Sequence, residues 1–562
     1  MQLNQNKALR WHLLYKIGSN EPSSVSFKSI LFGIVSKSSK MNVEILTPPV
    51  KSDNDKKEYR AIQLPNGLKA ILIKRVEDDG SENEINAAAA LVVGVGSFDD
   101  PSNIGGLAHF LEHMLFMGSQ KYPQESGYND FISANGGSNN AMTENENTVY
   151  FFDVAEKAFP ESLDRFGQQF IAPLLSKNAI QRERESVDSE FHMAQKIDDI
   201  RLNALSKSLA VSSHPASFFD YGNSTTLKEN ISDDDLYEAV LNFFKKYIAN
   251  NMFLSVQSNR DLDELQRIVV EIFSEVKSGE ISIRPQLSPS EIFKPEFNTK
   301  MFYVKPIAEK DQVVMTWAVD SVIPYYKSRP LSYIEVIFDN GGEGGLVNYL
   351  REKNFATSVA FENASDAISV HSMFTNVKLS VSLTKRGLEN VEKVLEAIFS
   401  YLLMLKETST EEHCRLYEVH KAKEETSFKF FKEQNQSDNV MMTVFGLKTY
   451  SPVDAIRGHR IYQGFDEEVI SSYINALNQR NFNLVIMTKS HDKFDKTEKY
   501  FGVEYDEIDF PEKYQKLWDE RKTNPEFLLE KSNPFTTTNF EIFVNDAESP
   551  VRENFSFFKD SS

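Results

Sequence analysis

His109, Glu112 and His113 form the pattern with the most chemical content in this chain. The two histidines are four residues apart, so on a helix of 3.6 residues per turn their side chains lie on one face, about 40° apart. Two imidazoles on one face can bind the same metal ion, and zinc is typically held by histidine and carboxylate ligands. Glu112 lies beside them, placed to hold a water molecule. The order H-x-x-E-H inverts the H-E-x-x-H zinc motif, so the pattern predicts half of a hydrolytic zinc site.

A third ligand is expected in the acidic segment 182–190. Glu183 and Glu190 are seven residues apart and therefore almost superposed on one face of a helix. Val187 lies between them, which favours a buried polar site. The alternative interpretation is that the histidines and acids pair across a polar surface without a metal ion.

The segments around these residues resemble the pitrilysin/insulinase family of zinc metallopeptidases, and the insulysin branch in particular. The family signature is H-x-x-E-H followed by a distant glutamate ligand, and here 76 residues separate His113 from Glu190. The resemblance spans residues 55–545. It is carried by Gly105–Ala108, Met114–Ser119, Lys121–Pro123, Gly136–Thr143, His214–Pro215, Gly222–Asn223 and Asn533–Ile542.

The resemblance implies a role for each residue of the motif. His109, His113 and Glu190 would be the ligands of one zinc ion, with a fourth position left for water. Glu112 would be the general base that takes a proton from this water and passes it to the leaving amine. Glu183 would lie outside the ligands and orient one of them.

Substrate binding is implied at three further positions. Asn140 and Ala141 would lie on an edge strand to which a peptide adds as an extra strand. Without the resemblance, an edge strand blunted by polar residues would be the simpler interpretation. Phe116 would line a substrate pocket, although aromatic residues at helical spacing are more often part of the core.

The order of elements fits the fold that the resemblance implies, an α+β fold of two homologous α/β-sandwich domains with zinc in the first. We expect an N-terminal extension over 1–54, a catalytic domain over 55–280, a linker over 281–297, a second domain over 298–545 and a tail over 546–562. In the first domain we expect strands at 68–73, 87–95 and, as a pair, 139–154, and one helix over 178–210 that carries Glu183 and Glu190.

The second domain repeats this order in degenerate form. Strands are expected at 301–304, 313–319 and 483–487. A helix at 346–351 follows a glycine-rich turn, as the motif helix does, but it has no histidine. The second domain is therefore predicted to be inactive.

Composition limits the class of protein. A chain of 562 residues is too long for one core and predicts two to four domains. With 82 acidic against 62 basic residues, the net charge of −20 argues against a nucleic-acid partner. The single cysteine, Cys414, cannot form an intrachain disulfide, which fits a reducing compartment. No apolar run approaches the ~18 residues of a membrane span, so we expect a soluble, cytoplasmic protein.

Residues 1–40 leave a different location open. They carry six basic residues and one acidic residue, a composition typical of a transit peptide. A mitochondrial or other organellar location is therefore the alternative. Met41 is an alternative start of the chain.

Two departures from the family pattern qualify the predicted function. Leu111 stands where many insulysins have a cysteine, so thiol reagents should not act through that position. The chain is also only half as long as family insulysins, whose second pair of domains closes a chamber. We therefore predict a zinc endopeptidase acting on peptide substrates that depends on a C-terminal half or partner subunit for full activity. Two alternatives are one subunit of an organellar processing-peptidase heterodimer, and a non-catalytic peptide-binding chain.

Overall fold

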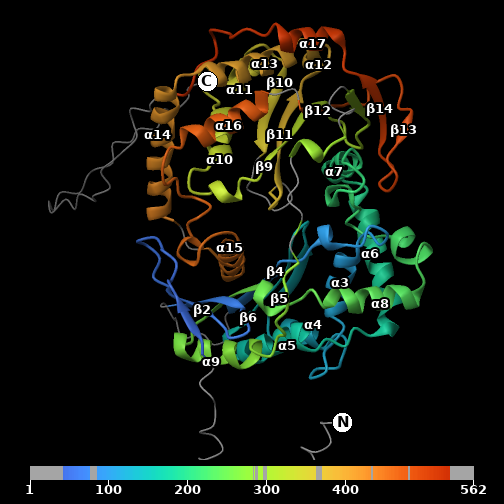
Figure 1. Ribbon diagram of the computed structural model, residues 1–562, viewed down its shortest axis with the longest axis vertical. Helices are drawn as coiled ribbons and strands as arrows, with labels where there is room; N and C mark the ends of the chain where they lie inside the picture. The colour runs from blue at the N-terminus through green and yellow to red at the C-terminus, as the bar shows by residue number, and fades with distance from the viewer. Residues whose placement is uncertain are drawn as a thin grey trace, which may run out of the picture.

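The computed structural model describes residues 42–75, 85–282, 284, 289–294, 300–362, 370–431, 434–478 and 481–531. They form two units stacked one above the other (Figure 1). We name residues 42–282 the first unit and residues 300–531 the second unit. Each is built on a seven-stranded mixed sheet covered by helices. The predictions for residues 1–40, for part of the linker 281–297 and for residues 532–562 lie outside the described residues.

The first sheet has the strand order β1-β2-β3-β7-β4-β6-β5. β3 and β7 are parallel, and all other neighbours are antiparallel. The strands are β1 Glu44–Leu46, β2 Glu58–Gln63, β3 Lys69–Lys74, β4 Ile85–Val93, β5 Ser138–Thr143, β6 Thr148–Ala155 and β7 Met252–Ser258. Residues 87–93 of the central strand β4 are buried on both faces, which fits their apolar sequence. β5 is at the end of the sheet, beside the motif helix.

The helices of the first unit are α3 Leu107–Leu115, α4 Gly127–Ala134, α5 Phe159–Ile171, α6 Ile180–Ala194, α7 Asp198–Ser208, α8 Asp233–Phe244 and α9 Leu262–Phe273. The single helix expected over 178–210 is wrong. Residues 195–197 interrupt it, because Ile197 is extended, with φ −108° and ψ 114°. The break turns α7 away from the first unit and toward the second (Figure 1).

The second sheet has the order β10-β11-β9-β12-β8-β14-β13. Its strands are β8 Lys300–Val304, β9 Gln312–Asp320, β10 Ala356–Glu362, β11 Phe374–Leu383, β12 Phe482–Met487, β13 Lys496–Thr497 and β14 Glu504–Asp509. Five neighbouring strands of this sheet, β8-β12-β9-β11-β10, correspond to β3-β7-β4-β6-β5 of the first sheet in spatial order and in strand direction. The structure thus confirms the predicted internal repeat.

The helices of the second unit refine this repeat. They are α10 Pro330–Phe338, α11 Leu346–Glu352, α12 Lys385–Leu388, α13 Val391–Glu407, α14 Thr410–Lys429, α15 Gln436–Thr449, α16 Glu467–Asn478 and α17 Glu512–Asp519. Two helices, α10 and α11, lie between β9 and β10, just as α3 and α4 lie between β4 and β5. By order, α10 and not α11 is the counterpart of the motif helix, so the sequence-based match was wrong. Neither helix contains a histidine.

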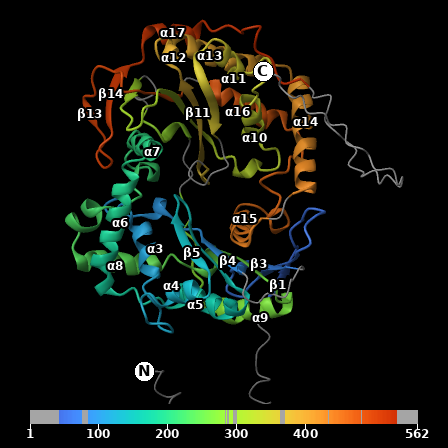
Figure 2. The same ribbon diagram turned by 180° about the vertical axis from the view of Figure 1, so that it is seen from behind.

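Each unit covers one face of the other unit's sheet (Figures 1 and 2). From the second unit, α15 packs Val440, Val444 and Leu447 against alternate residues of β3 and β4. From the first unit, α6 and α7 pack their apolar side chains against the second sheet; this cluster includes Phe191, Leu202, Leu205, Phe302, Val314, Phe374 and Val485. Neither sheet is fully covered by its own unit alone.

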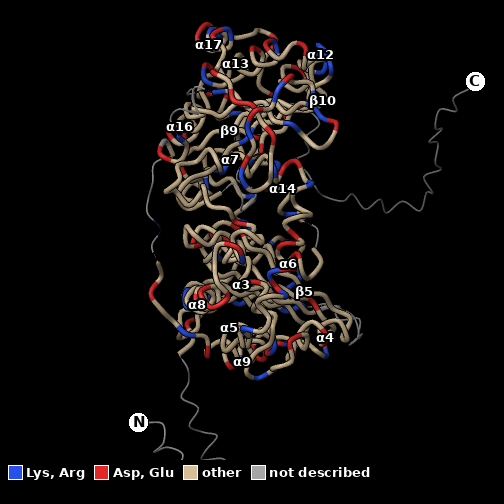
Figure 3. Tube along the Cα trace, turned by 90° about the vertical axis from the view of Figure 1, so that its right-hand side faces the viewer, with Lys and Arg blue, Asp and Glu red and all other residues tan. Residues whose placement is uncertain are grey.

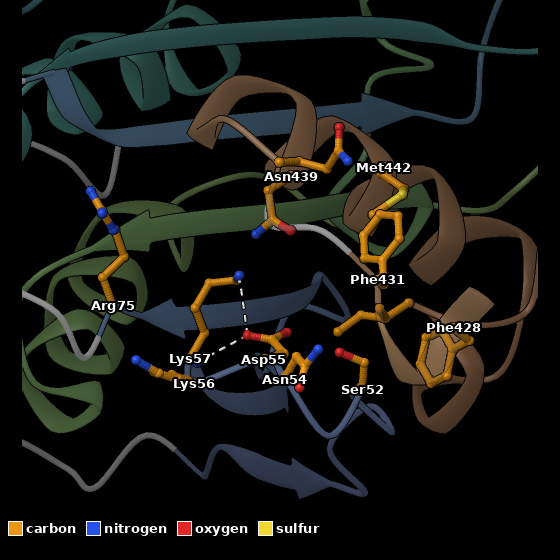
Figure 4. A pocket seen from close by; sticks show the side chains of 12 residues that line it. Ser52, Asn54, Asp55, Lys56, Lys57, Arg75, Phe428, Phe431, Asn439 and Met442 are labelled. Atoms are coloured by element: carbon orange, nitrogen blue, oxygen red, sulfur yellow. Dashed lines mark hydrogen bonds and ion pairs between the residues drawn. The ribbon is translucent and has the colours of Figure 1, made fainter. Parts of the chain in front are cut away.

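The N-terminal segment 42–57, most of which was expected to belong to the N-terminal extension 1–54, contains β1, which pairs with β2. The segment also contacts the second unit. Val50 N donates to Val453 O at 2.9 Å, and a small hollow forms between residues 52–57 and the ends of α14 and α15 (Figure 4). In its wall the buried Lys57 pairs with Asp55 at 3.1 Å. These contacts explain why the segment is ordered before the first long strand.

Charged residues of both signs alternate along both units (Figure 3). Of the helices that the structure describes, none is both long and apolar enough to cross a membrane.

Candidate metal centre and cleft

Helix α3 presents His109 and His113 to a cleft while its other side is buried. Leu111, Met114 and Leu115 are fully buried in the first core. The start of the helix is fixed by Asp100, whose carboxylate accepts hydrogen bonds from Gly106 N at 2.9 Å and Ala108 N at 2.8 Å. These two N–H groups have no partner inside the helix, so the buried Asp100 satisfies them and orients α3.

Helix α6 brings the two predicted acids to the histidines. The Nε2 atom of His109 lies 3.3 Å from Glu190 Oε2, and Nε2 of His113 lies 3.5 Å from Glu190 Oε1. Glu183 is behind His113, with 3.6 Å between Oε2 and Nδ1. The seven-residue spacing therefore places both acids on the α3 side of α6, as predicted, with Glu190 in front of the histidines and Glu183 behind one of them.

A backbone carbonyl that the sequence did not point to orients His109. Its Nδ1–H donates to Tyr221 O at 2.6 Å, which leaves Nε2 free to face Glu190. The loop that carries Tyr221 can come this close because Gly106 and Gly222 face each other. A Cβ on Gly106 would lie 2.2 Å from the Gly222 Cα, and both glycines have positive φ. Gly222 is part of the resemblance to the family. The Tyr221 carbonyl, 112 residues from His109, is a backbone group that no sequence pattern marks.

Glu112 is buried, and its Oε2 accepts a hydrogen bond of 2.5 Å from the Thr143 hydroxyl at the end of β5. Burial raises the pKa of Glu112, and the nearby His109 and the Thr143 hydrogen bond partly offset this effect. A raised pKa suits a carboxylate that must accept and release a proton near neutral pH. Thr143 was part of the recognised segment but had no role assigned from sequence.

The site as a whole favours positive charge. Burial alone would lower the pKa of His113, but Glu183 and Glu190 raise it to about 9. His109 and His113 in turn hold the pKa of Glu190 well below its usual range. Five carboxylates, those of Glu112, Glu144, Glu183, Glu190 and Asp220, line the cleft, and its described lining residues include no lysine or arginine.

The donor set fits a zinc ion. Around tetrahedral zinc, with bonds of about 2.0–2.2 Å to nitrogen and oxygen, neighbouring ligand atoms are about 3.3–3.6 Å apart. The two Nε2-to-Glu190 distances of 3.3 and 3.5 Å fall in this range and are long for hydrogen bonds. Ligand atoms of His109, Glu112 and His113 also lie within 4.8 Å of one another, so Glu112 is a competing third ligand. Because Glu112 already accepts a short hydrogen bond from Thr143, Glu190 is favoured as the third ligand.

The cleft has a volume of 590 Å³ and runs between α3, α6 and the edge strand β5. Asn140 and Ala141 lie on β5 and line it, as predicted. The Asn140 side chain accepts a hydrogen bond from Ala141 N at 2.9 Å, so its oxygen already holds the strand's own backbone. Phe116 lines the cleft and also packs against the first core.

Two other histidines lie apart from this group. His192 is exposed and contacts Gln195 and Asp188. His214 is buried, and its Nδ1 accepts a hydrogen bond from Ala216 N at 2.9 Å, so it stabilises a turn.

Comparison with a solved structure defines the class of fold. The crystal structure of pitrilysin superposes with a TM-score of 0.81 at 24% sequence identity, over 91% of this chain and 53% of that one. The chain thus has the α+β fold of pitrilysin.

Sequence comparison then gives the family. Three domain families match in succession: "Insulinase (Peptidase family M16)" over residues 76–216, "Peptidase M16 inactive domain" over 235–417 and "Middle or third domain of peptidase_M16" over 428–554. The chain belongs to the insulinase family of peptidases, family M16.

Its curated relatives are much longer. Human nardilysin is 35% identical over 491 residues, which are 86% of this chain and 42% of nardilysin. Human insulin-degrading enzyme is 32% identical over 504 residues, 89% of this chain and 48% of that enzyme. The chain therefore spans less than half the length of these relatives.

Proposed function

We propose that the chain is a zinc-dependent endopeptidase that hydrolyses peptides, with His109, His113 and Glu190 as zinc ligands. The observation that carries the proposal is the ligand spacing, in which both Nε2 atoms face the two oxygens of one carboxylate at 3.3 and 3.5 Å. The match to peptidase family M16 and the acidic cleft support it. When bound, zinc would lower the pKa of a water molecule and polarise a peptide carbonyl.

The residues of the chain do the remaining work. Thr143 holds Glu112 Oε2, so Oε1 is left to take a proton from a water molecule in the cleft and return it to the leaving amine. Glu183 pairs electrostatically with Nδ1 of His113 from the far side, and the Tyr221 carbonyl orients His109 through a hydrogen bond. A peptide would bind by adding its backbone to the outer edge of β5 next to Glu112.

A partner is part of this proposal. Because the chain spans less than half of its relatives, we propose that a C-terminal half or a partner subunit completes the cleft. The cytoplasmic location predicted from sequence, and the organellar alternative, stay predictions.

Metal content and hydrolysis of a quenched peptide by the purified chain test the function. We expect one zinc ion per chain and hydrolysis that a chelator abolishes and zinc restores. Zinc binding without hydrolysis, even with a C-terminal half added, would instead support a non-catalytic peptide-binding chain.

A further inference from the structure

The turn between β5 and β6 is buried, although hairpin turns usually lie on the surface. Asn145, Glu146 and Asn147 are only 5%, 4% and 7% exposed. Glu146 has no part in the proposed chemistry, yet a buried carboxylate is costly unless it is hydrogen-bonded. Its partners therefore indicate what the turn does.

Glu146 connects the turn to the second unit and to the linker. Its carboxylate accepts hydrogen bonds from Ser372 N at 2.8 Å and from the Ser372 hydroxyl at 2.6 Å. Arg284 of the linker lies 3.7 Å from the same carboxylate, and it also donates to Asp99 at 2.5 Å. Beside it, Asn145 Nδ2 donates to Nε2 of the buried His371 at 2.8 Å.

The other end of the turn reaches the catalytic carboxylate. Thr143 is the last residue of β5, three positions before Glu146, and its hydroxyl donates to Glu112 at 2.5 Å. Between the two, Glu144 N donates to Asn147 O at 2.7 Å. Gly96 packs so closely that a Cβ would lie 2.3 Å from Glu144 O. The turn is therefore stiff, and a displacement at Glu146 moves Thr143.

We infer that Glu146 is a positioning residue, through which the second unit holds the Thr143 hydroxyl against Glu112. This inference rests on the proposed function, because it gives Glu112 the role of general base. It also gives the second unit, which has no histidine at the matching helices, a part in hydrolysis. Misplacement of a catalytic group by about 1 Å can cost about a hundredfold in rate.

A double-mutant cycle tests the inference in the full chain. Glu146→Ala should lower kcat about 10- to 100-fold, with KM and zinc content changed less than about threefold because no ligand moves. Thr143→Val should lower kcat as well. If Glu146 acts through Thr143, the double variant loses no more than the stronger single variant. Losses that multiply would overturn the inference, as would an unchanged kcat in Glu146→Ala.

Asp198 supplies the matched control. It is also a buried carboxylate between the two units, and it accepts hydrogen bonds from Ile307 N at 2.8 Å and Ala308 N at 3.0 Å and not from residues of the turn. The effects of Asp198→Asn and Thr143→Val should multiply. If the losses in kcat do not multiply in this pair, then any contact between the units is coupled to Thr143. That result would contradict a specific role of Glu146.

Hydrogen exchange gives a readout that does not depend on hydrolysis. In the zinc-free chain, Glu146→Ala should speed amide exchange in residues 138–148 and leave α3 protected. Should Glu146→Ala fail to fold, Ser372→Ala removes only one of the two hydrogen bonds and should have the same effect in weaker form. Unchanged exchange in the folded variant contradicts the inference. If wild-type chain shows no hydrolysis but the exchange pattern holds, the proposed function fails while the coupling of the turn stands.

Discussion

Val444→Asp should destabilise both units together, because α15 belongs to the second unit but lies on the first sheet. Val444 is fully buried among residues of β3 and β4. Removing its side chain from this cluster costs about 2 kcal/mol in apolar burial. An unpaired carboxylate in a dry interface adds several kcal/mol more. We expect a loss of about 4 kcal/mol or more, a large part of the 5–15 kcal/mol that stabilises most proteins.

Two probes follow the two units during heating. Trp317 and Trp518 are in the second unit, so tryptophan fluorescence mainly reports its unfolding, whereas zinc release reports the first unit. In wild type the two unfolding transitions should coincide. Val444→Asp should lower the midpoint temperature of both by about 4 °C or more, given the entropy of unfolding when the two units unfold together. Ile45→Asp is the control, because Ile45 is 61% exposed on β1. Separate transitions in wild type, or a shift in fluorescence alone, would refute the reciprocal packing.

The other predictions concern ligands, pH and the partner. Glu190→Gln should weaken zinc binding far more than Glu183→Gln, for which a loss of about 10- to 100-fold is usual. Competition with a chelator measures both affinities, and equal values would contradict the ligand assignment. Burial and the nearby Lys207 lower the pKa of His371 to about 3, while its unfolded pKa is about 6.5. Between these two pKa values the unfolded chain binds a proton at His371 that the folded chain does not. The free energy of unfolding therefore has its full value above pH 6.5 and decreases as the pH falls. From pH 7.5 to 5 this loss is about 2 kcal/mol in urea unfolding. His371→Phe should remove it, and a pH slope unchanged in that variant would show that His371 is not its source. Finally, a separately expressed C-terminal half should raise kcat about a hundredfold, since an oxyanion donor contributes about 10² to 10³ and the described lining of the cleft includes no lysine or arginine. Full turnover by the chain alone would argue against a missing half.

The sequence predicted the repeat and the motif helix because both depend on local periodicity. The i, i+4 histidines and the seven-residue spacing of Glu183 and Glu190 fix side-chain direction on a helix, whatever surrounds it. The same logic failed at Ile197, where a helical pattern continues through a break that serves packing between the units.

Contacts between distant segments could not be predicted in this way. The Tyr221 carbonyl on His109 is a backbone group, and the Thr143 hydroxyl on Glu112 requires knowing which strand lies beside α3. The packing of α15 on the other unit's sheet was also missed, since an apolar helix face does not say which sheet it will cover.

Anomalous diffraction at the zinc edge, from crystals of the zinc-loaded chain, tests the central claim most directly. We predict one peak about 2.0–2.2 Å from Nε2 of His109, from Nε2 of His113 and from a carboxylate oxygen of Glu190, with Glu112 hydrogen-bonded to Thr143 and not bonded to the metal. A peak bonded to Glu112 in place of Glu190 would contradict the assignment of base and ligand, and no peak at this site would contradict the metal centre itself.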